Sequence, residues 1–166
     1  QECSFKTYVI CCQNLLNYEK YLTDGVDSLF SITNDNQMCN IIDSLSSIYP
    51  RVFFILQFLG CHGPYNNFSK EFDTFHPNHI TDNNSWEDRN AVMNSYDNTV
   101  VYMDYNLYNI IQVINKPHTE SALLFISDHG EAFLPGTSGH GNSCNPNKEE
   151  YYTNLLKSNS LSSNFL

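Results

Sequence analysis

The chain has 166 residues and a net charge of −10, from eight Lys and Arg against eighteen Asp and Glu. A single domain has about 100–200 residues, so the length allows one core. Hydrophobic residues make up 41% and aromatic residues 14%, which excludes a chain that is disordered throughout. The negative charge disfavours nucleic acid as a partner. The longest apolar run, at 52–59, is far shorter than the about 20 residues of a membrane span.

The chain ends and the cysteines bear on its origin. The first residue is Gln1, with no initiator Met and no basic-then-apolar leader, so we expect the chain to begin inside a larger gene product or after a cleavage. Six cysteines are present, and none has the C-x-x-C spacing of a structural zinc site. They are Cys3, Cys11, Cys12, Cys39, Cys61 and Cys144. Their redox state stays open at this point.

The first half of the chain predicts strand, loop, helix and strand. The segment 7–12 (TYVICC) is short, apolar and contains β-branched residues, which is typical of a buried strand. The polar residues 13–20 predict a loop or a short helix. Apolar residues at steps of three and four predict a helix from Met38 to Ile48, ended by Pro50. Residues 52–59 are apolar on both alternating faces, which predicts a central strand of a parallel sheet covered on both sides.

The second half, together with the strand at 52–59, predicts a β-α-β unit. Residues 65–85 are polar and without a period, so we expect a long surface excursion. An imperfect capping box, Ser85-x-x-Asp88, precedes a long amphipathic helix that Lys116-Pro117 ends. Residues 122–127 predict a second buried strand.

Two residues inside the long predicted helix have poor helix propensity. They are Asp97 and Asn98, whose side chains favour a local polar partner over a helical backbone. We therefore expect them to brace a neighbouring loop.

Polar residues follow both predicted central strands. In parallel α/β sheets, ligands bind beyond the carboxyl ends of the strands. His62 follows the first of these strands, Asp128 and His129 follow the second, and His140 lies in a Gly-rich loop that can fold back toward them. One carboxylate and three imidazoles suit zinc, with manganese as the second choice. The residues therefore predict a metal or phosphate site.

Each candidate also has a structural interpretation. Asp128 can cap a turn with His129 on the surface, and His62 and His140 can be loop residues hydrogen-bonded to backbone. Residue types alone leave both interpretations open. Glu131 is expected to be exposed, and the remaining histidines are expected to be solvated. These are His76, His79 and His118.

Several motifs in this order resemble the phosphoethanolamine transferases of the alkaline phosphatase and sulfatase superfamily, which modify lipid A and include the mobile colistin-resistance enzymes. Gly60-Cys61-His62-Gly63-Pro64-Tyr65 is similar to the family's Gly-Ser-His-Gly-Pro-Tyr loop. Residues 96–105 (YDNTVVYMDY) resemble the family's helix motif, and residues 125–131 (FISDHGE) resemble its metal-binding strand end. His140-Gly141 falls where the family has its second His-Gly pair. Residues 5–8 and 71–75 also resemble family segments.

The resemblance implies a fold and a reaction. The fold would be an α/β/α sandwich with a mostly parallel central sheet, alkaline phosphatase-like and incomplete at its N-terminal side. Asp128 and His129 would be ligands of the catalytic zinc, and His62 and His140 would hold the substrate phosphate or a second zinc. In the family a Thr takes phosphoethanolamine from phosphatidylethanolamine and passes it to lipid A or another surface glycan, at the periplasmic face of the bacterial inner membrane.

The chain also departs from the family pattern. The nucleophilic Thr and a Glu ligand of the same zinc lie upstream of the matched residues 7–12, as does the membrane domain, so we expect none of them here. We expect residues 1–154 to be a partial catalytic domain, inactive or nearly so alone, and 155–166 to be a Ser/Asn-rich tail. Two alternatives stay open: a sulfatase or phosphomonoesterase of the same fold, and a non-catalytic metal-binding remnant.

Overall fold

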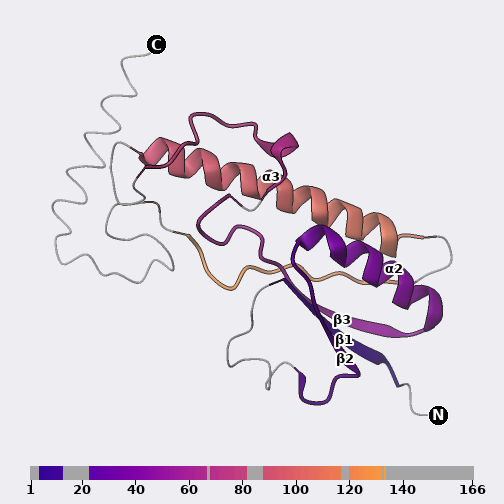
Figure 1. Ribbon diagram of the computed structural model, residues 1–166. Coiled ribbons are helices and arrows are strands. Elements are labelled where there is room, and N and C mark those ends of the chain that lie inside the picture. Colours follow the sequence, from indigo (N-terminus) through magenta and orange to yellow (C-terminus); the bar gives the residue numbers. More distant parts are fainter. Residues whose placement is uncertain are drawn as a thin grey trace. The chain divides into compact units, whose positions relative to one another are not determined.

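The computed structural model describes residues 4–12, 23–66, 68–81, 88–116, 120–131 and 133. Their elements, in chain order, are β1 (Lys6–Cys11), β2 (Ser28–Ser31), the 3-10 turn η1 (Asp35–Gln37), α2 (Met38–Ile48), β3 (Val52–Gln57), the 3-10 turn η2 (Lys70–Phe72) and α3 (Arg89–Ile114) (Figure 1). The chain divides into two compact units. One comprises Gln1–Pro77 and Asn94–Phe125, and the other Asn78–Met93 and Ile126–Leu166.

The three strands form a parallel sheet in the order β2-β1-β3. Tyr8 pairs with Ser28 on one side of β1 and with Phe54 on the other. Because β1 lies in the middle, its Val9 and Ile10 are fully buried. The predicted first strand and the parallel sheet are confirmed, whereas β2 was not predicted.

β3 was expected to be a central strand, and this expectation is wrong for the described part of the chain. Its ladder joins it to β1 along one edge only. Phe53 is 54% exposed, and the other side chains of β3 are half-buried. An apolar run on both faces indicates burial on both faces, but it does not specify the number of neighbouring strands. In this sheet the central place belongs to β1.

The core lies between the sheet and the two helices. Ile10 of β1, Met38 and Ile42 of α2, and Ile110 of α3 form one fully buried cluster. Both helices therefore cover the face of β1 that carries Ile10 (Figure 1). The predicted helix 38–48 is confirmed in its bounds, and Tyr49, before Pro50, has extended backbone.

The long helix α3 agrees closely with its predicted limits. It begins at Arg89, directly after Asp88, and ends at Ile114, two residues before Lys116. The Asp88 carboxylate accepts hydrogen bonds from the backbone N–H and the hydroxyl of Thr81, at 2.7 and 2.6 Å. It therefore ties the end of the excursion to the start of α3. Ser85 and Pro117 lie outside the described residues.

Residues 122–127 were predicted to be a buried strand, and this prediction is wrong. The segment makes no strand pairing and its side chains are exposed, Leu124 by 83% and Ile126 by 74%. Strand propensity is expressed only where a ladder partner and a covering face are available, and the described residues offer this segment neither. The predicted β-α-β unit therefore lacks its last strand in the described chain.

The described residues also bear on the expectations about membrane spans, cysteines and the chain termini. None of the described helices is long and apolar enough to cross a membrane. The four cysteines in the described ranges, Cys11, Cys12, Cys39 and Cys61, are not disulfide-bonded. The expected loop or helix at 13–20, the tail at 155–166, Cys3 and Cys144 lie outside the described residues.

Candidate functional site

The loop that carries His62 leaves β3 through a tight turn. The backbone N–H of His62 donates to the carbonyl of Leu59 at 3.1 Å. Gly60 has φ of +47°, and a Cβ there would meet Sδ of Met103 at 2.9 Å. The positive φ favours glycine because it strains an L side chain, and the Met103 side chain of α3 would have to move to admit a Cβ. The sequence thus builds a fixed turn where β3 ends.

His62 is exposed, and the orientation of its ring follows from one hydrogen bond. Its Nδ1 lies 2.7 Å from the carbonyl oxygen of Gly63. A carbonyl oxygen only accepts, so Nδ1 carries the proton and Nε2 of the neutral ring carries the lone pair. Nε2 is therefore the ring nitrogen suited to bind a metal ion or, when protonated, a phosphate oxygen.

The same loop packs onto α3 through aromatic side chains. Tyr65 is only 7% exposed and has a positive φ of 55°. Its ring meets that of Tyr96 edge-on, with centroids 5.6 Å apart. A left-handed tyrosine is uncommon and persists where the surroundings hold it. The packing against α3 supplies that support.

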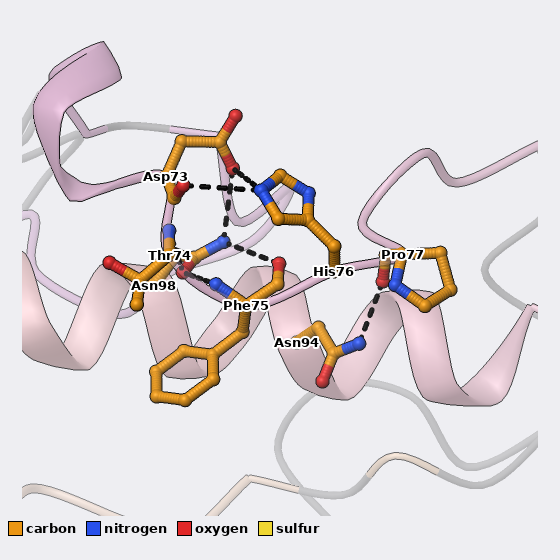
Figure 2. A network of polar contacts seen from close by, with 7 residues as sticks. All are labelled: Asp73, Thr74, Phe75, His76, Pro77, Asn94 and Asn98. Atoms are coloured by element: carbon orange, nitrogen blue, oxygen red, sulfur yellow. Dashed lines mark hydrogen bonds and ion pairs between the residues drawn. The ribbon is translucent and has the colours of Figure 1, made fainter.

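A second loop is held by Asn98, as Figure 2 shows. The fully buried Asn98 side chain accepts from the backbone N–H groups of Thr74 and Phe75, at 2.9 and 2.8 Å. Its amide donates to the Phe75 carbonyl at 3.1 Å and to Asp73 Oδ1 at 3.3 Å. One turn earlier in α3, Asn94 donates to the Pro77 carbonyl at 2.8 Å.

The expected bracing role is therefore confirmed for Asn98, whereas Asp97 is exposed. His76 and His79 are exposed as expected, and His76 bonds through Nε2 to the Asp73 carbonyl at 3.2 Å. His118 lies outside the described residues.

Asp35 is a polar residue of the site that the sequence analysis missed. It is 4% exposed, and its carboxylate accepts from the backbone N–H groups of Leu59 and Gly60. Burial, with the Asp35 carboxylate as the next cause, raises the pKa of the neighbouring Cys12 thiol to about 12. The sequence signal was the polar run 33–37 (TNDNQ), which follows the largely apolar residues 29–32 (LFSI). Such a run marks the carboxyl end of a strand.

Asp128 and His129 form a small turn in the second unit. The backbone N–H of His129 donates to Asp128 Oδ1 at 3.0 Å, and Asp128 Oδ2 lies 3.6 Å from His129 Nε2. His129 Nδ1 donates to the Gly130 carbonyl at 2.8 Å, the arrangement also found at His62. This bond again places the lone pair of the neutral ring on Nε2. Asp128 Oδ2 and His129 Nε2 are thus close enough for both to bind the same metal ion.

The turn differs from its prediction in two ways. Asp128 follows an extended, exposed segment and not a strand. Glu131, expected to be exposed, is half-buried, and its Oε1 is buried with no hydrogen-bond partner among the described residues.

The described residues contain no group of three or more His, Cys, Asp or Glu side chains that could hold a metal ion. His62 belongs to the first unit, and Asp128 and His129 belong to the second. His140 lies outside the described residues. The grouping of these four residues therefore stays a prediction.

Comparison with known proteins identifies the family. A family profile described as Sulfatase matches residues 19–160, most of the chain. The chain belongs to the sulfatase family. This sulfatase-family chain is 35% identical over 83 residues to phosphoethanolamine transferase EptA of Escherichia coli (strain K12), covering 47% of the chain and 15% of that protein. It is 34% identical over 83 residues to EptA of Helicobacter pylori, covering 49% of the chain and 16% of that protein.

A solved structure shares the fold of this chain. The crystal structure of the C-terminal periplasmic domain of phosphoethanolamine transferase EptC from Campylobacter jejuni matches with a TM-score of 0.58 at 24% identity. The match covers 68% of this sulfatase-family chain and 38% of that domain. The predicted fold class, a partial alkaline phosphatase-like α/β domain, is confirmed. The chain spans about 15% of the length of the curated relatives it matches.

Proposed function

We propose that the protein containing this chain is a metal-dependent phosphoethanolamine transferase, and that the chain forms part of its catalytic domain. The observation that carries the proposal is the 35% identity to phosphoethanolamine transferase EptA within a chain of the sulfatase family. The reaction is transfer of phosphoethanolamine from phosphatidylethanolamine to lipid A or another surface glycan. A Thr supplied outside this chain forms the covalent intermediate.

We propose zinc as the metal and test its fit on the donors present. Asp128 and His129 offer one carboxylate oxygen and one imidazole Nε2 at 3.6 Å from each other, both of which are zinc ligands. The hydrogen bond from His129 Nδ1 to a carbonyl is the support that zinc-binding histidines commonly have. The pair fits half of a tetrahedral site. Bound zinc would stabilise negative charge on the phosphoryl oxygens.

The histidines of the two loops act on the phosphoryl group in this proposal. His62 presents Nε2 from a turn fixed by Gly60 and supported by α3, and when protonated it donates to a phosphoryl oxygen. His140 takes the matching role from the Gly-rich loop, or joins His62 at a second zinc. Both roles position the phosphoryl group without forming a bond to phosphorus.

The proposed location is the periplasmic face of the bacterial inner membrane. EptC, whose domain shares this fold, is described as having a periplasmic C-terminal domain. Contact with the lipid substrates would come from a membrane domain elsewhere in the full-length protein. A second candidate, a sulfatase or phosphomonoesterase, is favoured by the family profile itself, because that profile does not distinguish transfer from hydrolysis.

The experiment uses the full-length gene product with phosphatidylethanolamine labelled in its headgroup. Asp128→Ala should lower both the zinc content and the transfer rate, and His62→Ala should lower the rate with the protein still folded. His79→Ala is the matched control, because His79 is an exposed histidine to which the proposal assigns no role. Equal transfer rates for His62→Ala and His79→Ala would contradict the role of His62. Unchanged zinc content in Asp128→Ala would contradict the metal assignment.

A further inference from the structure

The Asp35 carboxylate holds the first two residues of the His62 loop. Oδ1 accepts from the Leu59 backbone N–H at 2.9 Å, and Oδ2 accepts from the Gly60 backbone N–H at 2.8 Å. Asp35 opens η1, which follows β2, whereas Leu59 and Gly60 follow β3. The carboxylate therefore joins the ends of two strands that are not adjacent in the sheet.

The loop also packs against α3. Gly60 has φ of +47°, and its Cα approaches α3 so closely that a Cβ would lie 2.9 Å from Met103 Sδ. The Leu59 carbonyl in turn accepts from the His62 N–H at 3.1 Å. A displacement of Leu59 or Gly60 is consequently passed directly to His62.

The chemistry of the contact favours a carboxylate over an amide. Here the two N–H groups bond different oxygens of Asp35, and an Asn side chain in the same position would turn its NH2 group toward one of these N–H groups. A buried charge is costly unless it is hydrogen-bonded, and these two bonds satisfy that need. Among the described residues no Lys, Arg or His forms an ion pair with Asp35. Backbone donors of the loop itself therefore satisfy both carboxylate oxygens.

We propose that Asp35 is a positioning residue: its carboxylate fixes Leu59 and Gly60 so that His62 Nε2 meets the phosphoryl group of the substrate. The inference rests on the proposed function, because it assigns Asp35 a task in that reaction. A misplacement of about 1 Å at a group that orients substrate can lower a rate by about 100-fold. Loosening this turn is a change of that order.

The test is a double-mutant cycle in the full-length gene product. Asp35→Asn should lower kcat/KM for phosphoethanolamine transfer by about 10-fold or more in the wild-type background. In a His62→Ala background it should change kcat/KM by less than about twofold, because the residue it positions is gone. Equal factors in both backgrounds would overturn the proposal, since a general loss of structure acts regardless of residue 62.

Two further variants keep the test decisive. Asp43→Asn is the matched control, because Asp43 pairs with Lys116 on the protein surface, and it should leave kcat/KM unchanged. If Asp35→Asn fails to fold, Asp35→Glu keeps both oxygens and lengthens the side chain. Its smaller loss should also vanish in the His62→Ala background, and persistence of the full loss there would overturn the proposal.

Hydrogen exchange separates this inference from the proposed function. In Asp35→Asn the amides of Leu59 and Gly60 should exchange at least about 10-fold faster, while those of β1 keep their wild-type rates. Unchanged exchange at both amides would overturn the positioning role whatever the activity. A wild-type protein that transfers no phosphoethanolamine would overturn the proposed function, and the exchange rates would then still decide whether Asp35 holds the loop.

Discussion

Replacing Asn98 by alanine removes the contact that ties residues 73–75 to α3. The four hydrogen bonds of this side chain contribute about 4 kcal/mol if each is worth about 1 kcal/mol net. Alanine is the better helix former by about 0.6 kcal/mol, which offsets part of the loss. The free energy of unfolding should therefore fall by about 3 kcal/mol. The Thr74 and Phe75 amides should lose their protection from hydrogen exchange.

Asn94→Ala provides the control for this prediction. Asn94 lies one turn away on the same helix, and its side chain makes a single hydrogen bond within the described part of the chain, to the Pro77 carbonyl. With the same two values, Asn94→Ala should lower the free energy of unfolding by about 0.5 kcal/mol. Urea unfolding followed by circular dichroism measures both variants. Losses that agree within about 0.5 kcal/mol would refute the claim that Asn98 is the main anchor of the loop.

Three other variants test separate features of the fold. Gly60→Ala should lower the unfolding free energy by about 1–3 kcal/mol, because its φ is +47° and Met103 Sδ lies 2.9 Å from the added Cβ; an unchanged urea midpoint would contradict this geometry. Asn106→Leu should raise the melting temperature, because Asn106 is fully buried and its Oδ1 has no partner among the described residues; a lower melting temperature would count against it. Asp27→Asn should remove a pH-dependent contribution from the ion pair with Lys6, which lowers the pKa of Asp27 and raises that of Lys6. The ion pair contributes its full stabilisation between the ordinary pKa of Asp27, 3.8, and that of Lys6, 10.5. The stabilisation is lost as the pH falls through the lowered pKa of Asp27 or rises through the raised pKa of Lys6. Identical stability profiles against pH for the wild type and the variant would refute it.

The elements that the sequence predicted well are those with a strong local signal. The helix α2 has a clean three- and four-residue period and a proline after its end, and α3 has a long period with polar residues at its start. Asn98 was recognisable because an amide in a helix interior favours a polar partner. In these cases the residues that decide the structure lie within a few positions of one another.

The elements that were missed depend on partners far away in the chain. β2 is only four residues long and becomes a strand through pairing with β1. Residues 122–127 have the composition of a strand but lack a ladder partner among the described residues. Asp35 becomes part of the site through two amides that are 24 and 25 positions away. Such pairings are set by topology, which local patterns do not encode.

The candidate site also combines features that local sequence predicts with features that it does not. The sequence located His62 correctly in a loop after a strand, but it placed Asp128 and His129 at the end of a strand that the described residues do not form. It could not show how the His62 ring is oriented, because that depends on one hydrogen bond to the adjacent carbonyl. The prediction that these residues and His140 share one metal and phosphate site stays open to experiment.

The transferase assignment is tested most directly by the fate of a labelled phosphatidylethanolamine headgroup incubated with the full-length gene product, zinc and lipid A. We expect the label on the lipid A acceptor, with phosphoethanolamine released to water only as a minor product. Release to water as the main product, with no labelled acceptor, would contradict the transferase assignment. It would show instead that this member of the sulfatase family is a hydrolase.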